Sequence, residues 1–211
     1  CDSLLLQNEI IICTNCNHHL PYTNHHILAG NDTTKKFYGI IPVEFSAAML
    51  YFHQKGIVQN LIHNLKYKKH QEIGTLLGEW YSKDLESVAN IKTVSEIIPV
   101  PLHKKRLEER GYNQITTFCE ALSNELKIPY NPNLLYRNRY SKTQTKKDKE
   151  NRKDITNALF DVHFTETDSN KHFLLVDDVM TSGATLEACA KALLKIPNSK
   201  VSIVTIAYTQ S

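Results

Sequence analysis

Two adjacent carboxylates, Asp177 and Asp178, stand between a short apolar run and a turn of small, hydroxyl-rich residues. The apolar run, residues 173–176, is typical of a parallel strand that is covered on both faces. In the turn, residues 181–185, small side chains let backbone N–H groups approach an anion, and a helix that begins near Thr185 adds the positive end of its dipole. Because sugar hydroxyls donate hydrogen bonds and phosphate oxygens accept them, this pattern predicts a phosphosugar site.

Each half of this pattern also has a plainer interpretation. An acidic pair can simply begin a loop, and a Thr-Ser-Gly-Ala-Thr turn can be an ordinary helix cap. The two halves in direct succession favour the ligand site. A nucleotide hydrolase is not favoured, because the sequence has no Gly-x-x-x-x-Gly-Lys-Ser/Thr stretch.

At these residues the chain resembles the type I phosphoribosyltransferases, whose signature joins a hydrophobic strand, an acidic pair and a Thr-Ser/Thr-Gly-x-Thr loop. The resemblance implies an α/β fold, with a parallel sheet flanked by helices, that binds phosphoribosyl pyrophosphate. It also implies that Asp177 and Asp178 are the catalytic pair and hold the ribose hydroxyls, while residues 181–185 wrap the 5′-phosphate. The full set implied for this stretch is Asp177, Asp178, Val179, Met180, Thr181, Ser182, Gly183, Ala184 and Thr185. Mg²⁺ is the expected metal, because it prefers carboxylate and phosphate oxygens.

A second stretch, residues 97–114, runs from the end of a strand through a Pro-Val-Pro turn into a basic cluster. This stretch resembles the ComF/GntX family of competence proteins. Its Arg-Gly-Tyr-Asn-Gln segment, residues 110–114, matches that family's Arg-Gly-x-Asn-Gln stretch. The resemblance implies a loop that contacts the pyrophosphate through His103, Lys104, Lys105 and Arg106. Cations suit a diphosphate, and Arg can donate paired hydrogen bonds to its oxygens. The alternative for the lysines alone is a solvated helix start.

Leu65-Lys66-Tyr67 is a short element that also resembles the ComF family. By that resemblance Lys66 lies beside the pyrophosphate. The alternative is a surface lysine that closes a helix, since residues 58–66 have the helical spacing of apolar positions.

A basic stretch, residues 134–153, carries eight basic and two acidic side chains, a local charge of +6 in a chain whose net charge is +3. Type I phosphoribosyltransferases carry a mobile loop at this place that closes over the substrate, which adds cations near the leaving group. The residues implied for such a flexible loop are Arg137, Arg139, Gln144, Lys146, Lys147 and Arg152. The alternative is a highly charged, disordered linker.

The first residues suggest a different chemistry, because Cys13 and Cys16 form a Cys-x-x-Cys turn, which is half of a zinc site. ComF proteins commonly begin with two such turns in a small zinc ribbon. That resemblance implies Cys1, Cys13 and Cys16 as ligands of a structural Zn²⁺, with a fourth ligand upstream or supplied by His18 or His19. Thioredoxin-like redox chemistry is the rival interpretation, but no βαβ pattern surrounds the turn.

The 211 residues, of which 41% are hydrophobic, predict one full-sized core, residues 37–211, with a small zinc-binding module in residues 1–36. Strand and helix patterns alternate along the core, which predicts a parallel sheet whose ligand lies at the carboxyl ends of the strands. A strand or hairpin is expected at residues 40–50, and strands at 96–100, 172–177 and 201–206. Helices are expected at 58–66, 73–85, 112–127 and 185–195. Five cysteines and the absence of an 18-residue apolar run predict a cytoplasmic protein without a membrane span.

The resemblance implies a ComF-family protein that binds phosphoribosyl pyrophosphate and serves in natural competence. The further partners that it implies are single-stranded DNA and the competence machinery at the inner membrane. Tyr112, Tyr136 and Tyr140 lie among the basic stretches and could stack on bases. The alternative function is an active phosphoribosyltransferase that displaces pyrophosphate with an unidentified base. The residues leave open whether the protein is an enzyme.

Overall fold

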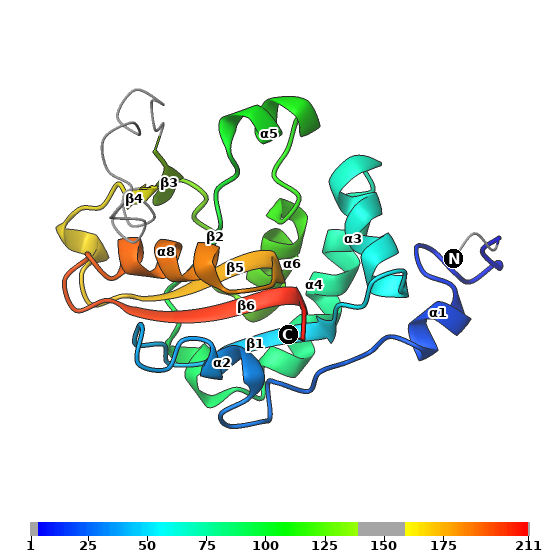
Figure 1. The fold of residues 1–211 in the computed structure, drawn as a ribbon, viewed down its shortest axis with the longest axis horizontal. Coiled ribbons are helices and arrows are strands. Elements are labelled where there is room, and N and C mark those ends of the chain that lie inside the picture. Colours follow the sequence, from blue (N-terminus) through cyan, green and yellow to red (C-terminus); the bar gives the residue numbers. More distant parts are fainter. Residues whose placement is uncertain (1–3, 139–158, 211) are drawn as a thin grey trace.

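The computed structural model describes residues 4–138 and 159–210 and is built around four parallel strands in the order β1–β6–β5–β2 (Figure 1). These strands are β1 (Ser46–Tyr51), β2 (Glu96–Pro99), β5 (His172–Met180) and β6 (Lys200–Tyr208). Across the centre of the sheet, Val176 of β5 pairs with Pro99 of β2 and with Val204 of β6. Because every pair is parallel, the carboxyl ends of these strands meet at one edge. The predicted parallel α/β sheet is confirmed.

Helices cover both faces of the sheet, as its apolar strands require. One face packs on α3 (Ile57–Tyr67), α4 (Glu72–Leu85) and α6 (Thr116–Leu126), and the other packs on α8 (Ala184–Leu193). In β5, Leu174 and Val176 belong to the first core, while Phe173 and Leu175 belong to the second. This alternation explains why residues 173–176 are apolar without interruption.

The helices α4 and α6 approach each other closely at two glycines. A Cβ atom at Gly78 would lie 2.6 Å from Ala121 Cβ, and one at Gly74 would lie 2.2 Å from Thr117 Oγ1. A larger residue at either position would therefore push the two helices apart. The contact fixes α6, and with it the segment that leads into α6.

The remaining described elements are short. They are α1 (Thr14–His18), α2 (Asp32–Lys35), the 3-10 helix η1 (Ala89–Thr93), α5 (Lys104–Arg110), β3 (Leu135–Arg137), β4 (Phe160–Val162) and the 3-10 helix η3 (Glu166–Asp168). Strands β3 and β4 form an antiparallel pair that stands beside α8, and α5 rises next to it above the sheet (Figure 1).

The structure changes three of the predicted elements. The strand expected at 172–177 continues to Met180, because Val179 and Met180 still pair with β6, so both acidic residues lie inside the strand. The helix expected at 112–127 begins only at Thr116, after a separate helix, α5, that ends at Arg110 and is capped by Gly111. The strand expected within 40–50 begins at Ser46.

Residues 23–34 make several hydrogen bonds with β1. The Thr23 N–H donates to the Met49 carbonyl at 3.0 Å, and the Asn31 amide donates to the Ser46 carbonyl at 2.8 Å. The division at residue 36 stays a prediction. Within the described residues, no helix is both long and apolar enough to cross a membrane.

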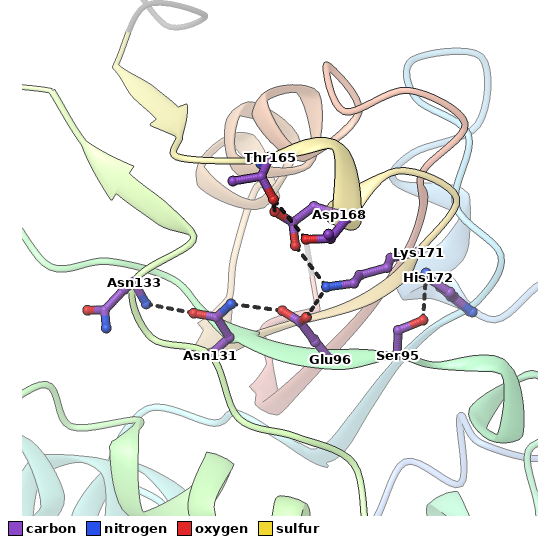
Figure 2. Close-up of polar contacts among 9 residues, drawn as sticks. Ser95, Glu96, Asn131, Asn133, Thr165, Asp168, Lys171 and His172 are labelled. Carbon is purple, nitrogen blue, oxygen red and sulfur yellow. Dashed lines mark hydrogen bonds and ion pairs between the residues drawn. The ribbon is translucent and has the colours of Figure 1, made fainter.

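At the amino edge of the sheet, Lys171 lies between two carboxylates (Figure 2). Its Nζ donates to Glu96 and, at 2.8 Å, to Asp168 Oδ1. Asn131 adds a second donor to Glu96, at 2.9 Å. The pKa of Asp168 is lowered, chiefly by the hydrogen bond from Lys171. At this edge the lysine and the two carboxylates therefore pair with one another.

Candidate functional site

The carboxyl end of β5 leads into a tight turn that opens α8. Gly183 caps the helix with φ +83°, a left-handed conformation that favours glycine. Thr181 and Ser182 before it and Ala184 and Thr185 after it are exposed. The first turn of a helix carries N–H groups that have no partner inside the helix, so this turn can receive an anion such as a phosphate.

Asp178 is buried on the α3 and α6 side of β5, where two donors reach one of its oxygens. Lys66 Nζ lies 2.9 Å from Asp178 Oδ2, and the side-chain amide of Gln114 donates to the same oxygen at 2.6 Å. Among the described residues, both side-chain contacts of Asp178 end on Oδ2. No side-chain contact of the described residues reaches the other oxygen, Oδ1.

The carboxyl group of Asp177 has a raised pKa. Its pKa is raised to about 8, first by burial and then by the charge of Asp178, while the hydrogen bond from the Asp178 N–H opposes this shift. That bond reaches Asp177 Oδ1 at 2.8 Å. The ion pair with Lys66 is made by Asp178.

Lys66 is brought to the site by the last turn of α3, where its side chain is 21% exposed. The sequence left two interpretations of Lys66, a pyrophosphate contact or a surface lysine that closes a helix. The structure shows a helix end whose lysine turns toward the acidic pair. Its contact with pyrophosphate stays a prediction.

The Arg-Gly-Tyr-Asn-Gln segment joins three parts of the site. The Asn113 amide donates to the Val100 carbonyl at 3.0 Å, and the Tyr112 hydroxyl donates to the Leu65 carbonyl. Arg110 Nη1 donates to Gln114 Oε1 at 2.5 Å, and the Arg110 guanidinium lies 5.0 Å from the centre of the Tyr67 ring. The segment thus links the turn after β2, the end of α3 and Asp178.

The basic cluster after β2 lies on α5 rather than in a loop. His103 caps this helix, and its Nδ1 accepts from the Lys105 N–H at 3.2 Å. Lys104 and Lys105 pair with Glu108 and Glu109, at 3.4 and 3.9 Å. Arg106 is also exposed. The local structure is the solvated helix start, and the predicted pyrophosphate contacts of these four residues remain predictions.

Only one residue of the implied flexible loop is described. Arg137, in β3, places its guanidinium 5.3 Å from the centre of the Phe160 ring, and burial lowers its pKa. The others, Arg139, Gln144, Lys146, Lys147 and Arg152, lie outside the described residues.

Lys36 was not predicted, yet it lies against the turn after β5. A Cβ atom at Gly183 would be 3.9 Å from Lys36 Cβ and 3.5 Å from the Phe37 ring. Lys36 Nζ is 5.7 Å from the centre of the Tyr208 ring, at the end of β6. No local pattern in the sequence predicts this contact, because Lys36 and Gly183 are far apart along the chain.

Cys13 and Cys16 lie together at α1, both buried. The Cys16 N–H donates to Cys13 Sγ at 3.4 Å, and such bonds lower the pKa of Cys13, which suits a thiolate ligand. Cys1 lies outside the described residues, and among those described no three His, Cys, Asp or Glu side chains gather as a metal site. Whether His18 or His19 supplies a ligand stays a prediction. The two thiols fit half of a zinc site.

Comparison with known proteins agrees with this geometry. The family described as phosphoribosyl transferase domain matches residues 116–211, which include α6, the acidic pair and the turn before α8. The DNA utilization protein YhgH of Escherichia coli (strain K12) is 26% identical over 187 residues, 87% of this chain and 78% of that protein. Competence protein F of Haemophilus influenzae is 32% identical over 57% of this chain and 53% of its own length. Competence protein ComFC of Bacillus subtilis is 34% identical over 47% of this chain and 38% of its own length.

The parallel sheet with helices on both faces, together with the family match, defines a phosphoribosyltransferase-like protein with the type I α/β fold. Its relatives narrow this class further. The chain is similar in sequence to proteins named for competence and for DNA utilization, in line with its predicted resemblance to the ComF family.

Proposed function

We propose that this protein binds phosphoribosyl pyrophosphate at the carboxyl edge of its sheet and serves in natural competence and DNA uptake. One observation carries the proposal: an acidic pair in β5 is followed directly by a glycine-capped helix start. The competence role draws on relatives named for competence and DNA utilization.

The site's own residues suit the two halves of this ligand. Asp178 Oδ1 would accept from a ribose hydroxyl, while Lys66 and Gln114 hold Oδ2. The N–H groups of residues 181–185 would bind the 5′-phosphate. Mg²⁺, bound through the ligand's own phosphate oxygens, would supply charge neutralisation.

The test compares the wild type with Asp177→Asn/Asp178→Asn by calorimetry with phosphoribosyl pyrophosphate and Mg²⁺. Loss of the carboxylate acceptors should weaken binding by more than about 100-fold, because hydrogen bonds to charged groups contribute about 1.5–3 kcal/mol each. The control is Asp84→Asn/Glu86→Gln, which removes two carboxyl groups where α4 ends, and it should bind as the wild type does. Equal affinities in all three proteins would refute the site.

The same protein should be tested with bases and single-stranded DNA. We expect DNA binding that weakens steeply with salt, since Lys104 and Lys105 are exposed on α5, above the sheet. Pyrophosphate release that depends on an added base would instead establish a phosphoribosyltransferase. If Asp177→Asn/Asp178→Asn still binds DNA, then DNA and phosphoribosyl pyrophosphate bind through different residues. A cytoplasmic location and contacts with the inner-membrane competence machinery belong to the same proposal.

We also propose that Cys13 and Cys16 bind a structural Zn²⁺ together with Cys1 and a fourth ligand. The two buried thiols and the N–H bond to Cys13 support this. Zinc content measured by atomic emission should fall in Cys13→Ser/Cys16→Ser and stay unchanged in Cys119→Ser/Cys189→Ser. The latter pair is buried in the two apolar cores.

A further inference from the structure

Gln114 is buried between two charged groups, and its two amide atoms meet opposite charges. Nε2 donates to Asp178 Oδ2 at 2.6 Å, and Oε1 accepts from Arg110 Nη1 at 2.5 Å. Gln114 is only 5% exposed. The reversed amide would set its NH₂ group against the guanidinium and its oxygen against the carboxylate, so the two neighbours fix one orientation.

From this geometry we propose that Gln114 is a positioning residue that holds the Asp178 carboxylate in the orientation that receives the ribose. The inference rests on the proposed binding of phosphoribosyl pyrophosphate. It also assigns a role to the Arg-Gly-Tyr-Asn-Gln segment: Arg110 fixes the amide, and the amide fixes the carboxylate.

The two donors on Asp178 Oδ2 differ in what they can do when a ligand arrives. Lys66 is a flexible cation that can turn toward the ligand's phosphates. Gln114 is neutral and stays in place, because it lies two residues before the packed helix α6 and is bound by Arg110. A neutral second donor also restricts rotation of the carboxylate without neutralising its charge.

Arg110 is itself restrained by α3. Its guanidinium lies 5.0 Å from the centre of the Tyr67 ring, and Nη2 lies 3.4 Å from the Tyr67 hydroxyl. Tyr67 follows Lys66 directly in α3. The last turn of α3 therefore reaches Asp178 by two routes. Lys66 contacts the carboxylate directly, and Tyr67 contacts it indirectly through Arg110 and Gln114.

The decisive variant is Gln114→Glu, measured by calorimetry with phosphoribosyl pyrophosphate and Mg²⁺ from acidic to alkaline pH. A second carboxylate beside Asp178 should weaken binding about 10- to 100-fold at alkaline pH, the effect of one charge-assisted hydrogen bond. Binding should recover on acidification, when a proton shared by the two carboxyl groups restores a hydrogen bond. The charged groups around position 114 are Arg110 from α5, Lys66 from α3, and Asp177 and Asp178 from β5.

The matched control is Gln59→Glu, the same change at an exposed position of α3, which should follow the wild-type pH profile. A Gln114→Glu protein that binds like the wild type at every pH would overturn the positioning role. If thermal unfolding shows that the Gln114→Glu protein is not folded, Arg110→Met is measured instead. That variant frees the amide and should weaken binding severalfold without the pH recovery, and wild-type affinity would again overturn the inference.

Failure of the wild type to bind would refute the proposed function instead. The positioning role is then decided by a carboxyl ¹³C titration of the unliganded proteins. Titration of the acidic pair should move to higher pH in Gln114→Glu, whereas an unchanged titration would overturn the role.

Discussion

Each edge of the parallel sheet holds a group of two carboxylates and one lysine, and the two groups are arranged differently. At the amino edge Lys171 touches both Glu96 and Asp168 (Figure 2). At the carboxyl edge Lys66 pairs with Asp178, while the pKa of Asp177 is raised to about 8 by burial and by the charge of Asp178.

The difference follows from geometry. Glu96 and Asp168 come from separate segments, so one lysine fits between them, whereas Asp177 and Asp178 are consecutive residues of one buried strand. The amino edge completes its own interactions. We have proposed that the carboxyl edge uses its carboxyl oxygens and N–H groups to bind a ligand. The raised pKa of Asp177 indicates that this arrangement costs stability.

The largest contrast should appear when one carboxylate is removed from each edge. Asp178→Asn should weaken binding of phosphoribosyl pyrophosphate about 100-fold or more, since the ribose acceptor is lost. Asp168→Asn should leave the affinity within about threefold, because its partner Lys171 lies at the other edge. Calorimetry on both variants makes the comparison, and a similar loss in both would contradict it.

The two edges should also respond to pH in opposite directions. The pKa of Asp177 is raised, so between about pH 4 and 8 the unfolded chain has released a proton that the folded protein keeps, and stability falls as pH rises. The pKa of Asp168 is lowered, so its contribution is present above about pH 4 and is lost on acidification.

Urea unfolding at several pH values tests this. Asp177→Asn should gain stability over the wild type as pH rises toward 8, by on the order of a few kcal/mol. Asp168→Asn should lose stability relative to the wild type at neutral pH, and the difference should shrink in acid. Parallel pH profiles for the wild type and Asp177→Asn would show that this carboxyl is ionised in the folded protein.

Replacing each lysine sharpens the comparison further. Lys171→Met leaves two partly buried carboxylates without their cation and should lower the free energy of unfolding by about 1–3 kcal/mol, with ligand affinity unchanged. Lys66→Met should cost less stability, because Gln114 still donates to Asp178, but should weaken ligand binding. The reverse pattern would mean that the roles of the two edges are exchanged.

The smallest effect concerns the glycine of the turn. Gly183→Ala and Gly39→Ala both place a side chain at positive φ, +83° and +70°, and each should cost about 1 kcal/mol of stability. Only Gly183→Ala should also weaken ligand binding, because Gly183 caps α8 next to the acidic pair. Equal ligand affinities in the two variants would show that the turn at Gly183 is not part of the ligand site.

What could be predicted from the sequence was local. The apolar run, the acidic pair and the turn before α8 are contiguous, so strand, ligand groups and helix start follow from one stretch. The helix α5 was missed, although Lys104 and Lys105 stand four residues before Glu108 and Glu109, a spacing that favours a helix.

The contacts that complete the site could not be predicted in the same way. Lys66 and Gln114 meet Asp178 across 112 and 64 residues of chain, through the packing of α3 and α6 on the sheet. Lys36 meets Gly183 because residues 23–34 are hydrogen-bonded to β1. Such contacts depend on tertiary packing, which leaves no periodic signal in the sequence.

The close approach of α4 and α6 has a genetic consequence. Gly74 and Gly78 touch no ligand group, but a side chain at either would displace the helix that follows Gln114. A random screen for loss of function should therefore return alleles at these two glycines, with temperature-sensitive phenotypes, alongside alleles of the acidic pair.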